Sequence, residues 1–377
     1  MPDVTAPLGA VPRDIRAAVV DSPGVMSMRT FPLPEIGSDE GLLKVSAAGV
    51  CGTDPKILHG KVLEIEYPLI LGHENVGRIA VVGGRAAKLW GVKAGDRVAV
   101  ESHVACGTCL DCLQGEYRTC RQTTSYGHTS ADTAPHLFGG LAQYMHLRRG
   151  SILYPIPDEV TNEEAVIGVS ALANGIEWTG LGGVTLGDVV VVQGVGQQGL
   201  SCVIAAKERG AQHVIAAGVS TDAERLASAA RLGADRTVNV EKESLLDVVL
   251  GATNGEGADV VVDVSGSPKA VQLSLDLVRR RGAIVLSGFV GKDTEVPLRT
   301  ELIVWKQLRV YGGLTRGVRS MHKSMAIMTS RKYDLGSLIT HRYTLEESEH
   351  AVKVAGGEVP GESAVKAVVF PNGWDGA

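Results

Sequence analysis

The sequence is poor in several features, and each shortage excludes a class of protein. Aromatic residues make up only 4% of its 377 residues, and no run of about eighteen consecutive apolar residues occurs, as a membrane-spanning helix would need. Basic residues are not in excess, because 37 Lys and Arg stand against 42 Asp and Glu, so nothing favours nucleic-acid binding. The N-terminus lacks the basic and apolar segments of a signal peptide. We therefore expect a cytoplasmic protein without a membrane or nucleic-acid partner.

Cysteine is also scarce, yet four of the six cysteines are crowded together. Cys106, Cys109, Cys112 and Cys120 fall within fifteen residues, in the run CGTCLDCLQGEYRTC. Disulfides between such close neighbours would strain the loop, and a disulfide scaffold needs an oxidising compartment that nothing else here indicates. Four thiolates can instead surround one Zn²⁺ at about 2.3 Å. The spacing predicts a closed structural zinc site.

The distribution of apolar residues predicts an α/β protein of two or three domains. After a loose arm of about a dozen residues, short β-like segments alternate with glycine turns, which favours an antiparallel, barrel-like domain. These segments are residues 16–20, 41–50, 74–83 and 96–100, and the chain ends in another at 364–370.

From about residue 185 the pattern becomes strand, glycine turn and helix, repeated. Continuously apolar strands that alternate with helices are typical of a parallel sheet covered on both faces. Strands are expected at 188–193, 213–218, 258–265, 282–288 and 308–313, and helices near 198–209 and 222–234.

A glycine motif follows directly after the strand expected at 188–193 and opens the next helix. In Gly194-Val195-Gly196-Gln197-Gln198-Gly199, the first glycine permits a tight turn, the second lets the backbone approach a pyrophosphate, and the third lets the helix pack closely on the strand. The helix N-terminus would face the negative charge. The motif in this setting predicts a dinucleotide site.

The choice between NAD and NADP stays open in the sequence. An acidic residue would be expected at the end of the next strand, but Gly218 and Ser220 stand there. Ser220, Thr221 and Arg225 offer a cradle for a 2′-phosphate, whereas Asp222 would reach the ribose if the loop folds back. Alternatively, Asp222 only caps the following helix.

A third group of residues offers metal ligands. Cys51 lies in GVCGTD (49–54), and His73 and Glu74 lie in LGHENVG (71–77). A thiolate and an imidazole are good zinc ligands, and a site with few protein ligands keeps an open position, as catalytic zinc requires. Without further support, a buried thiol and a hydrogen-bonded histidine would explain the same residues.

These three groups in this order resemble the zinc-dependent branch of the medium-chain dehydrogenase/reductase superfamily, which includes alcohol and polyol dehydrogenases. The resemblance extends from about residue 16 to 370. It implies a GroES-like β-rich catalytic domain, residues 1–170 and 312–377, and a Rossmann domain, residues 171–311. It also implies two zinc ions, one structural and one catalytic, with NAD or NADP, and a homodimer or homotetramer.

The resemblance assigns roles to particular residues. It implies that Cys51 and His73 hold the catalytic zinc, with Glu74 as an exchanging ligand or as a neighbour of the bound ligands. Asp54 would orient His73 and Thr53 would receive the substrate's hydroxyl proton. The stretch Ser287-Gly288-Phe289-Val290 would supply backbone contacts to the nicotinamide carboxamide.

Several positions depart from the family pattern. Ser170 stands where a third zinc ligand is expected, so Glu74, water, or a nearby acid, Glu163 or Glu164, would have to take its place. Lys56 stands where the family often has a histidine in the proton relay, for which His59 is a weak substitute. Asn174 replaces a frequent threonine near the cofactor. Cys202, on the helix after the glycine motif, is most simply a small buried hydrophobe.

We expect reversible hydride transfer between a primary or secondary alcohol, or a polyol, and NAD(P)⁺. The zinc would act as a Lewis acid on the alcohol oxygen and lower the pKa of its hydroxyl towards about 7. Ser170 motivates one alternative, a reductase of an activated carbonyl or enone with weakened or no zinc. A non-catalytic nucleotide-binding structural protein is a second alternative, from another class.

Overall fold

The structure is a computed structural model, and it describes residues 11–62, 65–291 and 293–374. The arm expected at the start of the chain falls almost entirely outside these residues. The chain divides into two compact units, which are described separately below: a β-rich unit, 1–169 with 328–377, and a nucleotide-fold unit, 170–327. Within the described residues, no helix has both the length and the apolar character that crossing a bilayer demands.

The β-rich unit is built on mainly antiparallel sheets, as the sequence predicts. One sheet has the order β10-β6-β5-β3-β18-β17, and β9 also pairs with β3; another has the order β2-β1-β4, and β7 pairs with β8. The strands are β1 (Asp14–Ser22), β2 (Val25–Pro32), β3 (Gly41–Gly49), β4 (Leu69–Ile70), β5 (Glu74–Val82), β6 (Arg97–Val100), β7 (His103–Val104), β8 (Thr124–Ser125), β9 (Tyr144–Leu147), β10 (Leu153–Pro155), β17 (Ile339–Thr344) and β18 (Lys366–Phe370).

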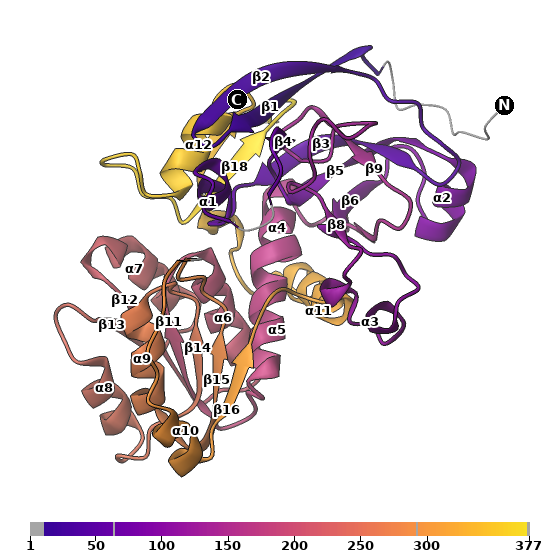
Figure 1. The fold of residues 1–377 in the computed structure, drawn as a ribbon. Coiled ribbons are helices and arrows are strands. Elements are labelled where there is room, and N and C mark those ends of the chain that lie inside the picture. Colours follow the sequence, from indigo (N-terminus) through magenta and orange to yellow (C-terminus); the bar gives the residue numbers. More distant parts are fainter. Residues whose placement is uncertain (1–10, 63–64, 292, 375–377) are drawn as a thin grey trace. The chain divides into compact units, whose positions relative to one another are not determined.

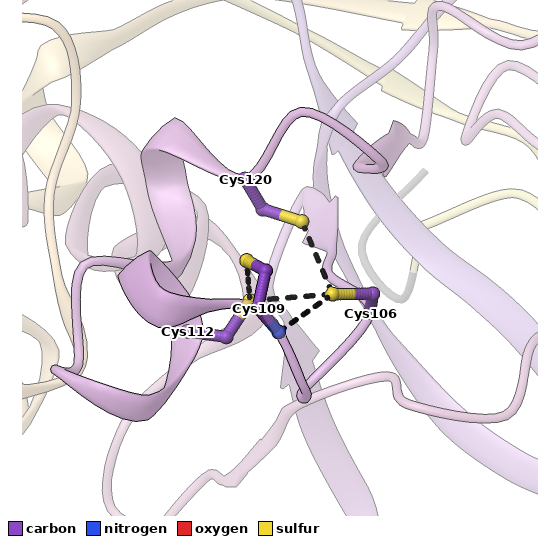
Figure 2. A group of neighbouring side chains, drawn as sticks. All are labelled: Cys106, Cys109, Cys112 and Cys120. Atoms are coloured by element: carbon purple, nitrogen blue, oxygen red, sulfur yellow. Dashed lines mark hydrogen bonds between the residues drawn. The ribbon is translucent and has the colours of Figure 1, made fainter.

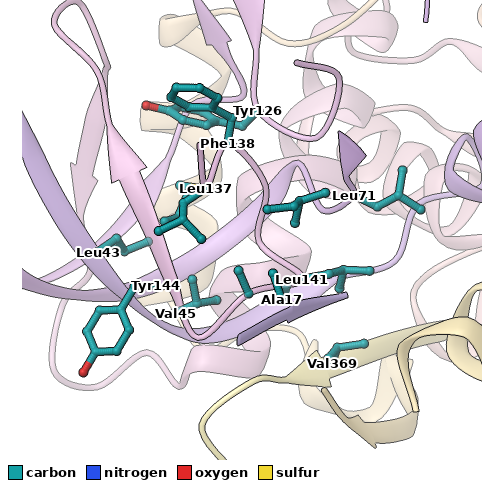
Figure 3. Packing of buried hydrophobic residues seen from close by; sticks show 14 of the residues in the cluster. Ala17, Leu43, Val45, Leu71, Tyr126, Leu137, Phe138, Leu141, Tyr144 and Val369 are labelled. Atoms are coloured by element: carbon teal, nitrogen blue, oxygen red, sulfur yellow. The ribbon is translucent and has the colours of Figure 1, made fainter. Parts of the chain in front are cut away.

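Strand β2 was not expected from the sequence. Most of its side chains are partly or fully exposed, so VMSMRTFP lacks the alternation that marks a half-buried strand. It forms because it pairs along nearly all of β1, whose residues between Ile15 and Val20 are mostly buried. The core beneath these sheets includes Ala17, Leu43, Val45, Leu137, Leu141 and Val369 (Figure 3).

Short helices connect the strands of the β-rich unit. They are α1 (Asp54–Leu58), α2 (Gly84–Trp90), α3 (Leu110–Leu113), α4 (Asn162–Ile167) and α12 (Ser348–Ala355), with 3₁₀ turns at Tyr117–Thr119 and Gly336–Leu338. Helix α4 begins with a capping box, in which Thr161 and Glu164 satisfy each other's backbone N–H groups.

The nucleotide-fold unit contains the predicted parallel sheet, with the order β13-β12-β11-β14-β15-β16 (Figure 1). Its strands are β11 (Val189–Gln193), β12 (His213–Gly218), β13 (Arg236–Asn239), β14 (Ala258–Asp263), β15 (Val278–Leu286) and β16 (Arg309–Gly312). Val190, Val191 and Val192 in the central strand β11 are fully buried, as expected of a strand covered on both faces. This order is that of a doubly wound nucleotide-binding fold.

Helices cover this sheet, with α6 packed against β11 and β12, and α9 against β14 and β15. The helices are α5 (Ala173–Leu181), which continues a π-helical turn at Gly168–Leu172, α6 (Gln197–Glu208), α7 (Ala223–Arg231), α8 (Leu245–Ala252), α9 (Pro268–Leu277) and α10 (Thr300–Lys306). Helix α11 (Val318–Thr329) crosses the second boundary between the units.

The second boundary lies at residue 328, later than the residue 312 expected from the sequence. The segment between these positions is tied to α5. The Arg316 N–H donates to Asn174 Oδ1 at 2.8 Å, and the Ser320 hydroxyl donates to Glu177 Oε2 at 2.5 Å. These bonds join residues more than a hundred positions apart, so no local pattern reveals them.

Candidate metal sites and dinucleotide loop

The four clustered cysteines converge on one point (Figure 2). Their sulfur atoms all lie within 4.8 Å of one another, and three of the separations are 3.4, 3.6 and 3.9 Å. None of the cysteines forms a disulfide. Sulfurs arranged tetrahedrally around Zn²⁺ are about 3.8 Å apart, which follows from a Zn–S distance of about 2.3 Å. The cluster therefore has the size that a zinc ion requires.

Local structure holds these sulfurs in place. Cys109 caps α3, and the backbone N–H groups of Thr108 and Cys109 approach Cys106 Sγ at 3.5 and 3.3 Å. Together with the Thr108 hydroxyl they lower the pKa of Cys106 to about 6. Desolvation and the neighbouring Cys109 thiol raise the pKa of Cys112 to about 12. A divalent cation among the four sulfurs would favour the thiolate form of them all.

We expect Cys120→Ser to cost the protein one zinc ion per chain. Three sulfurs would bind the ion more weakly than four, and the loop would lose its cross-link. Metal analysis after dialysis against a chelator, together with the thermal unfolding midpoint, measures both effects. Thr119→Ser is the control and should change neither; full zinc retention in Cys120→Ser would contradict a four-cysteine site.

A second group of possible ligands forms where β3 and β5 pair. Their antiparallel register sets Gly49 opposite Glu74, so Cys51, just beyond β3, lies close to His73 and Glu74 at the start of β5. One ligand atom from each of these three residues lies within 4.8 Å of the others. Thiolate, imidazole and carboxylate are all ligands that zinc accepts. The donor set fits a zinc ion with room for a further ligand.

Asp54 contacts two members of this group, Cys51 and His73. One carboxylate oxygen accepts the Cys51 N–H at 2.8 Å, and the other lies 3.5 Å from His73 Nδ1. Burial alone would lower the pKa of His73, but the Asp54 carboxylate and Cys51 sulfur outweigh it and hold that pKa well above its usual value. Because Asp54 faces Nδ1, the Nε2 atom of His73 is the one available to a metal.

Glu74 is bound to a buried lysine that the sequence analysis did not single out. Lys366 Nζ on β18 contacts Glu74 Oε2 and also donates to the Val50 carbonyl at 3.0 Å. Both side chains are at most 1% exposed. A Cβ at Gly49 would lie 2.3 Å from Glu74 Oε2, so only glycine leaves room for this pair. Glu74 is therefore shared between the ligand cluster and Lys366.

Removing Lys366 should destabilise the β-rich unit. Lys366→Met would leave Glu74 buried without its cation, at a cost of about 3–5 kcal/mol in the free energy of unfolding. The double variant Glu74→Gln/Lys366→Met removes both charges and should recover most of that loss. Urea unfolding measures the difference, and Lys353→Met, which breaks an exposed pair with Glu349, is the control. Equal stability of Lys366→Met and the wild type would contradict a structural ion pair.

The acids that the sequence offered as a third ligand are engaged elsewhere. Glu163 pairs with Arg342 at 2.6 Å, and Glu164 pairs with Arg331 at 2.6 Å while it caps α4. Neither belongs to the ligand cluster. Ser170 is 2% exposed in the π-helical turn.

Of two other histidines in the β-rich unit, one packs beside His73 and the other pairs with a glutamate. The His128 ring centroid lies 5.2 Å from that of His73, and His128 Nδ1 approaches the Tyr126 carbonyl at 3.2 Å. Burial, then the charge of His73, lowers the pKa of His128 to about 4, so it is neutral at pH 7. No spacing in the sequence marks His128. His59 instead pairs with Glu358 at 2.8 Å on the surface.

The remaining residues of the β-rich site lie beside Cys51. The Thr53 hydroxyl is 3.7 Å from Cys51 Sγ, and Lys56 is half-buried on α1. A hydroxyl this close to a ligand sulfur is in place to contact a molecule bound at the metal.

The glycine motif forms the turn between β11 and α6. Gly194 has a φ of +96°, and a Cβ there would lie 2.8 Å from the Ser265 backbone. A Cβ on Gly199 would lie 1.8 Å from the Gly194 carbonyl, whereas one on Gly196 would meet nothing within 4 Å. Two glycines are thus required by packing, and the third faces open space beside the α6 N-terminus, where backbone N–H groups attract an anion. Val195 lies in this turn, and Gln197 and Gln198 are the first residues of α6.

The loop after β12 is arranged around Asp222. Asp222 Oδ2 accepts the Val219 N–H at 3.1 Å, and Asp222 Oδ1 accepts from Arg225 at 2.8 Å. Asp222 stands at the N-cap position of α7, but its side chain makes no capping hydrogen bond to that helix and instead accepts the N–H that precedes the 3₁₀ turn Ser220–Asp222. Thr221 and Ser220 are exposed.

Two further predicted contacts lie in the nucleotide-fold unit. Ser287 Oγ is buried after β15, and Phe289 is 61% exposed. Asn174 Nδ2 donates to Gln198 Oε1 at 3.3 Å, which links α5 to the start of α6. Cys202 is fully buried in α6, as expected of a small hydrophobe.

Comparison with known proteins agrees with this geometry. Residues 37–158 match the family model described as alcohol dehydrogenase GroES-like domain, and residues 199–330 match that of zinc-binding dehydrogenase. A probable alcohol dehydrogenase of Mycobacterium tuberculosis is 36% identical over 95% of this chain and 98% of its own length. Sorbitol dehydrogenase of Bacillus subtilis is 33% identical over 96% and 99%.

Solved structures give the same result. An alcohol dehydrogenase of Thermotoga maritima superposes with a TM-score of 0.85 at 26% identity, covering 95% of this chain and all of that one. A putative zinc-binding dehydrogenase of Sinorhizobium meliloti, bound to NADP, has a TM-score of 0.84 at 26% identity, covering 95% and 99% of the two chains. A dehydrogenase of Escherichia coli complexed with NADH has a TM-score of 0.82 at 25% identity, covering 96% and 100%.

Proposed function

Because the chain belongs to the zinc-dependent medium-chain dehydrogenase/reductase superfamily, whose members here include alcohol, sorbitol and threonine dehydrogenases, we propose that it oxidises an alcohol or polyol reversibly with NAD(P)⁺ and zinc. It is an oxidoreductase that acts on CH–OH groups. The observation that carries the zinc-dependent proposal is the convergence of Cys51, His73 and Glu74 within 4.8 Å.

The two metal sites differ in what they leave open. Four cysteines would complete a tetrahedron and exclude substrate, so we assign that site a structural role. Cys51 and His73, with Glu74 shared with Lys366, would leave a position for the substrate oxygen. Zinc bound there supplies Lewis acidity towards that oxygen.

The residues around the second site would position its ligands, the substrate and the cofactor. Asp54 fixes the backbone at Cys51 and keeps His73 Nδ1 turned away from the metal position. Thr53 would take the hydroxyl proton of the substrate, and the distance of 3.7 Å between its hydroxyl and Cys51 Sγ supports this role. The glycine loop would hold the pyrophosphate of the cofactor whose nicotinamide accepts the hydride.

We expect Cys51→Ala to lose one zinc ion per chain and to lower kcat/KM for alcohol oxidation by about 10³-fold or more, because the Lewis acid would be lost. Steady-state rates on a panel of primary alcohols, secondary alcohols and polyols, with metal analysis, measure both. Cys202→Ala, a buried cysteine in α6, is the matched control and should keep metal and rate.

Turnover that survives in Cys51→Ala would contradict zinc-dependent alcohol oxidation. If reduction of an enone also persisted after chelation of the labile metal, the reductase alternative would replace it. Nucleotide binding without oxidoreduction across the whole panel would favour a non-catalytic role.

We also propose that two copies of the chain associate along β16. Within the described residues this strand pairs only with β15, so its other edge exposes backbone N–H and carbonyl groups. Exposed apolar side chains lie just before and just after this strand in the chain: Val304, Trp305 and Leu314 are 73%, 72% and 57% exposed. An exposed strand edge beside apolar side chains is a surface that a second copy can extend and cover.

Val310→Lys should therefore shift the protein towards monomer, since charges on an edge strand oppose pairing. Light scattering coupled to size exclusion measures the mass of the holoenzyme. Leu186→Lys, at a residue 84% exposed between α5 and β11, should leave the mass unchanged. A wild-type monomer at micromolar concentration would contradict the association.

A further inference from the structure

A glutamate from the neighbouring strand reaches the loop where the adenosine ribose is expected. Strands β12 and β13 are parallel, with Gly218 opposite Asn239, so the turns that follow them lie side by side. The Val240 N–H donates to the Gly218 carbonyl at 3.0 Å and extends this pairing by one residue. Glu241, next in the chain, therefore lies against the loop after β12.

Hydrogen bonds hold the Glu241 side chain in this position. Its Oε2 atom accepts the Ser220 N–H at 2.9 Å, and its own N–H donates to Asn239 Oδ1 at 3.1 Å. Asn239 Nδ2 in turn lies 3.1 Å from Ser220 Oγ. The Ser220 hydroxyl and N–H lower the pKa of Glu241, so the carboxylate is charged at neutral pH.

Two of the three residues that the sequence offered to a 2′-phosphate, Ser220 and Arg225, are thus bound to carboxylates. The Ser220 N–H binds Glu241, and Arg225 binds Asp222. One of these carboxylates, Asp222, pairs with the Arg225 guanidinium, and Lys242, beside Glu241 in sequence, offsets part of the Glu241 charge. An incoming phosphate would have to compete with both acids.

This loop is also the one that adjoins the glycine motif. A Cβ at Gly218 would lie 2.7 Å from Val195 Cγ2 and 3.2 Å from Asp222 Oδ2, so the Asp222 carboxylate lies beside the residue between the first two motif glycines. In a doubly wound fold, the adenosine ribose of a dinucleotide on the glycine loop lies at the end of the second strand, here β12.

We propose that Glu241, together with Asp222, selects NAD over NADP. Their carboxylates accept hydrogen bonds from the ribose hydroxyls and repel a 2′-phosphate, and the Glu241 charge reaches the ribose from the turn after β13. This inference rests on the proposed function only in requiring a dinucleotide at the glycine loop.

Calorimetric titration of the full chain with NAD⁺ and NADP⁺ tests the proposal without turnover, and 5′-AMP and adenosine 2′,5′-bisphosphate probe the adenosine end alone. We expect wild type to bind NADP⁺ at least about tenfold more weakly than NAD⁺, and Glu241→Gln to reduce that ratio by roughly tenfold, because one like charge is removed. Adding Asp222→Asn should bring the two affinities level or reverse them.

Glu243→Gln is the matched control, because Glu243 lies two residues further on and pairs with Arg236 at 2.6 Å. It should leave the ratio unchanged. Discrimination in wild type should also weaken as ionic strength rises, and less so in Glu241→Gln, since exposed charges are screened by salt. A purely structural role for Glu241 would produce no such difference.

Tight NADP⁺ binding by wild type, or an unchanged ratio in Glu241→Gln, would overturn the selection while leaving the proposed function intact. Failure to bind any of the four nucleotides would overturn the dinucleotide site itself, and the selection with it. Loss of alcohol turnover with NAD⁺ binding retained would count against the proposed function alone.

Discussion

The ligand cluster depends on the pairing of β3 with β5 and β18. Residues far apart in the chain meet there, because Gly49 lies opposite Glu74 on one side and opposite Val368 on the other. A shift of one residue in a strand turns every side chain to the other face of the sheet. The register therefore decides whether Cys51 faces His73 at all, and whether Lys366 reaches Glu74.

The sequence is most informative about a site whose residues all lie in one short segment. The four cysteines lie within fifteen residues, and the glycine motif lies within six, so spacing alone predicts that each converges. The parallel sheet is equally readable, because buried strands such as β11 are continuous runs of valine. The sequence does not reveal strand β2, because its side chains are mostly exposed. Nor does it reveal that the segment after residue 312 belongs with α5, because hydrogen bonds to Asn174 and Glu177 join these distant residues.

Charge distinguishes the two candidate zinc sites. Four thiolates around Zn²⁺ give a net charge of about −2, which suits a site that only cross-links a loop. One thiolate and one neutral imidazole leave the ion with a net positive charge, which suits polarisation of a bound oxygen. Lys366 matters to this balance, since it neutralises Glu74, and a second anion beside the ion would otherwise diminish that positive charge.

Pairing between neighbouring strands also brings separate residues together where the adenosine of the cofactor is expected. A search for an acid at the end of β12 finds none, because the carboxylates come from Asp222, just before α7, and from the turn after β13. Parallel pairing makes the second of these inevitable once Gly218 is opposite Asn239, since successive turns at the carboxyl edge of a parallel sheet must lie together. The position of an acid along one strand is thus an incomplete guide to cofactor choice, because the ribose contacts a surface to which two strands contribute. Here Asp222 pairs with the arginine of the loop and offsets its charge, and the Glu241 carboxylate adds a second negative charge, so the loop attracts a phosphate less.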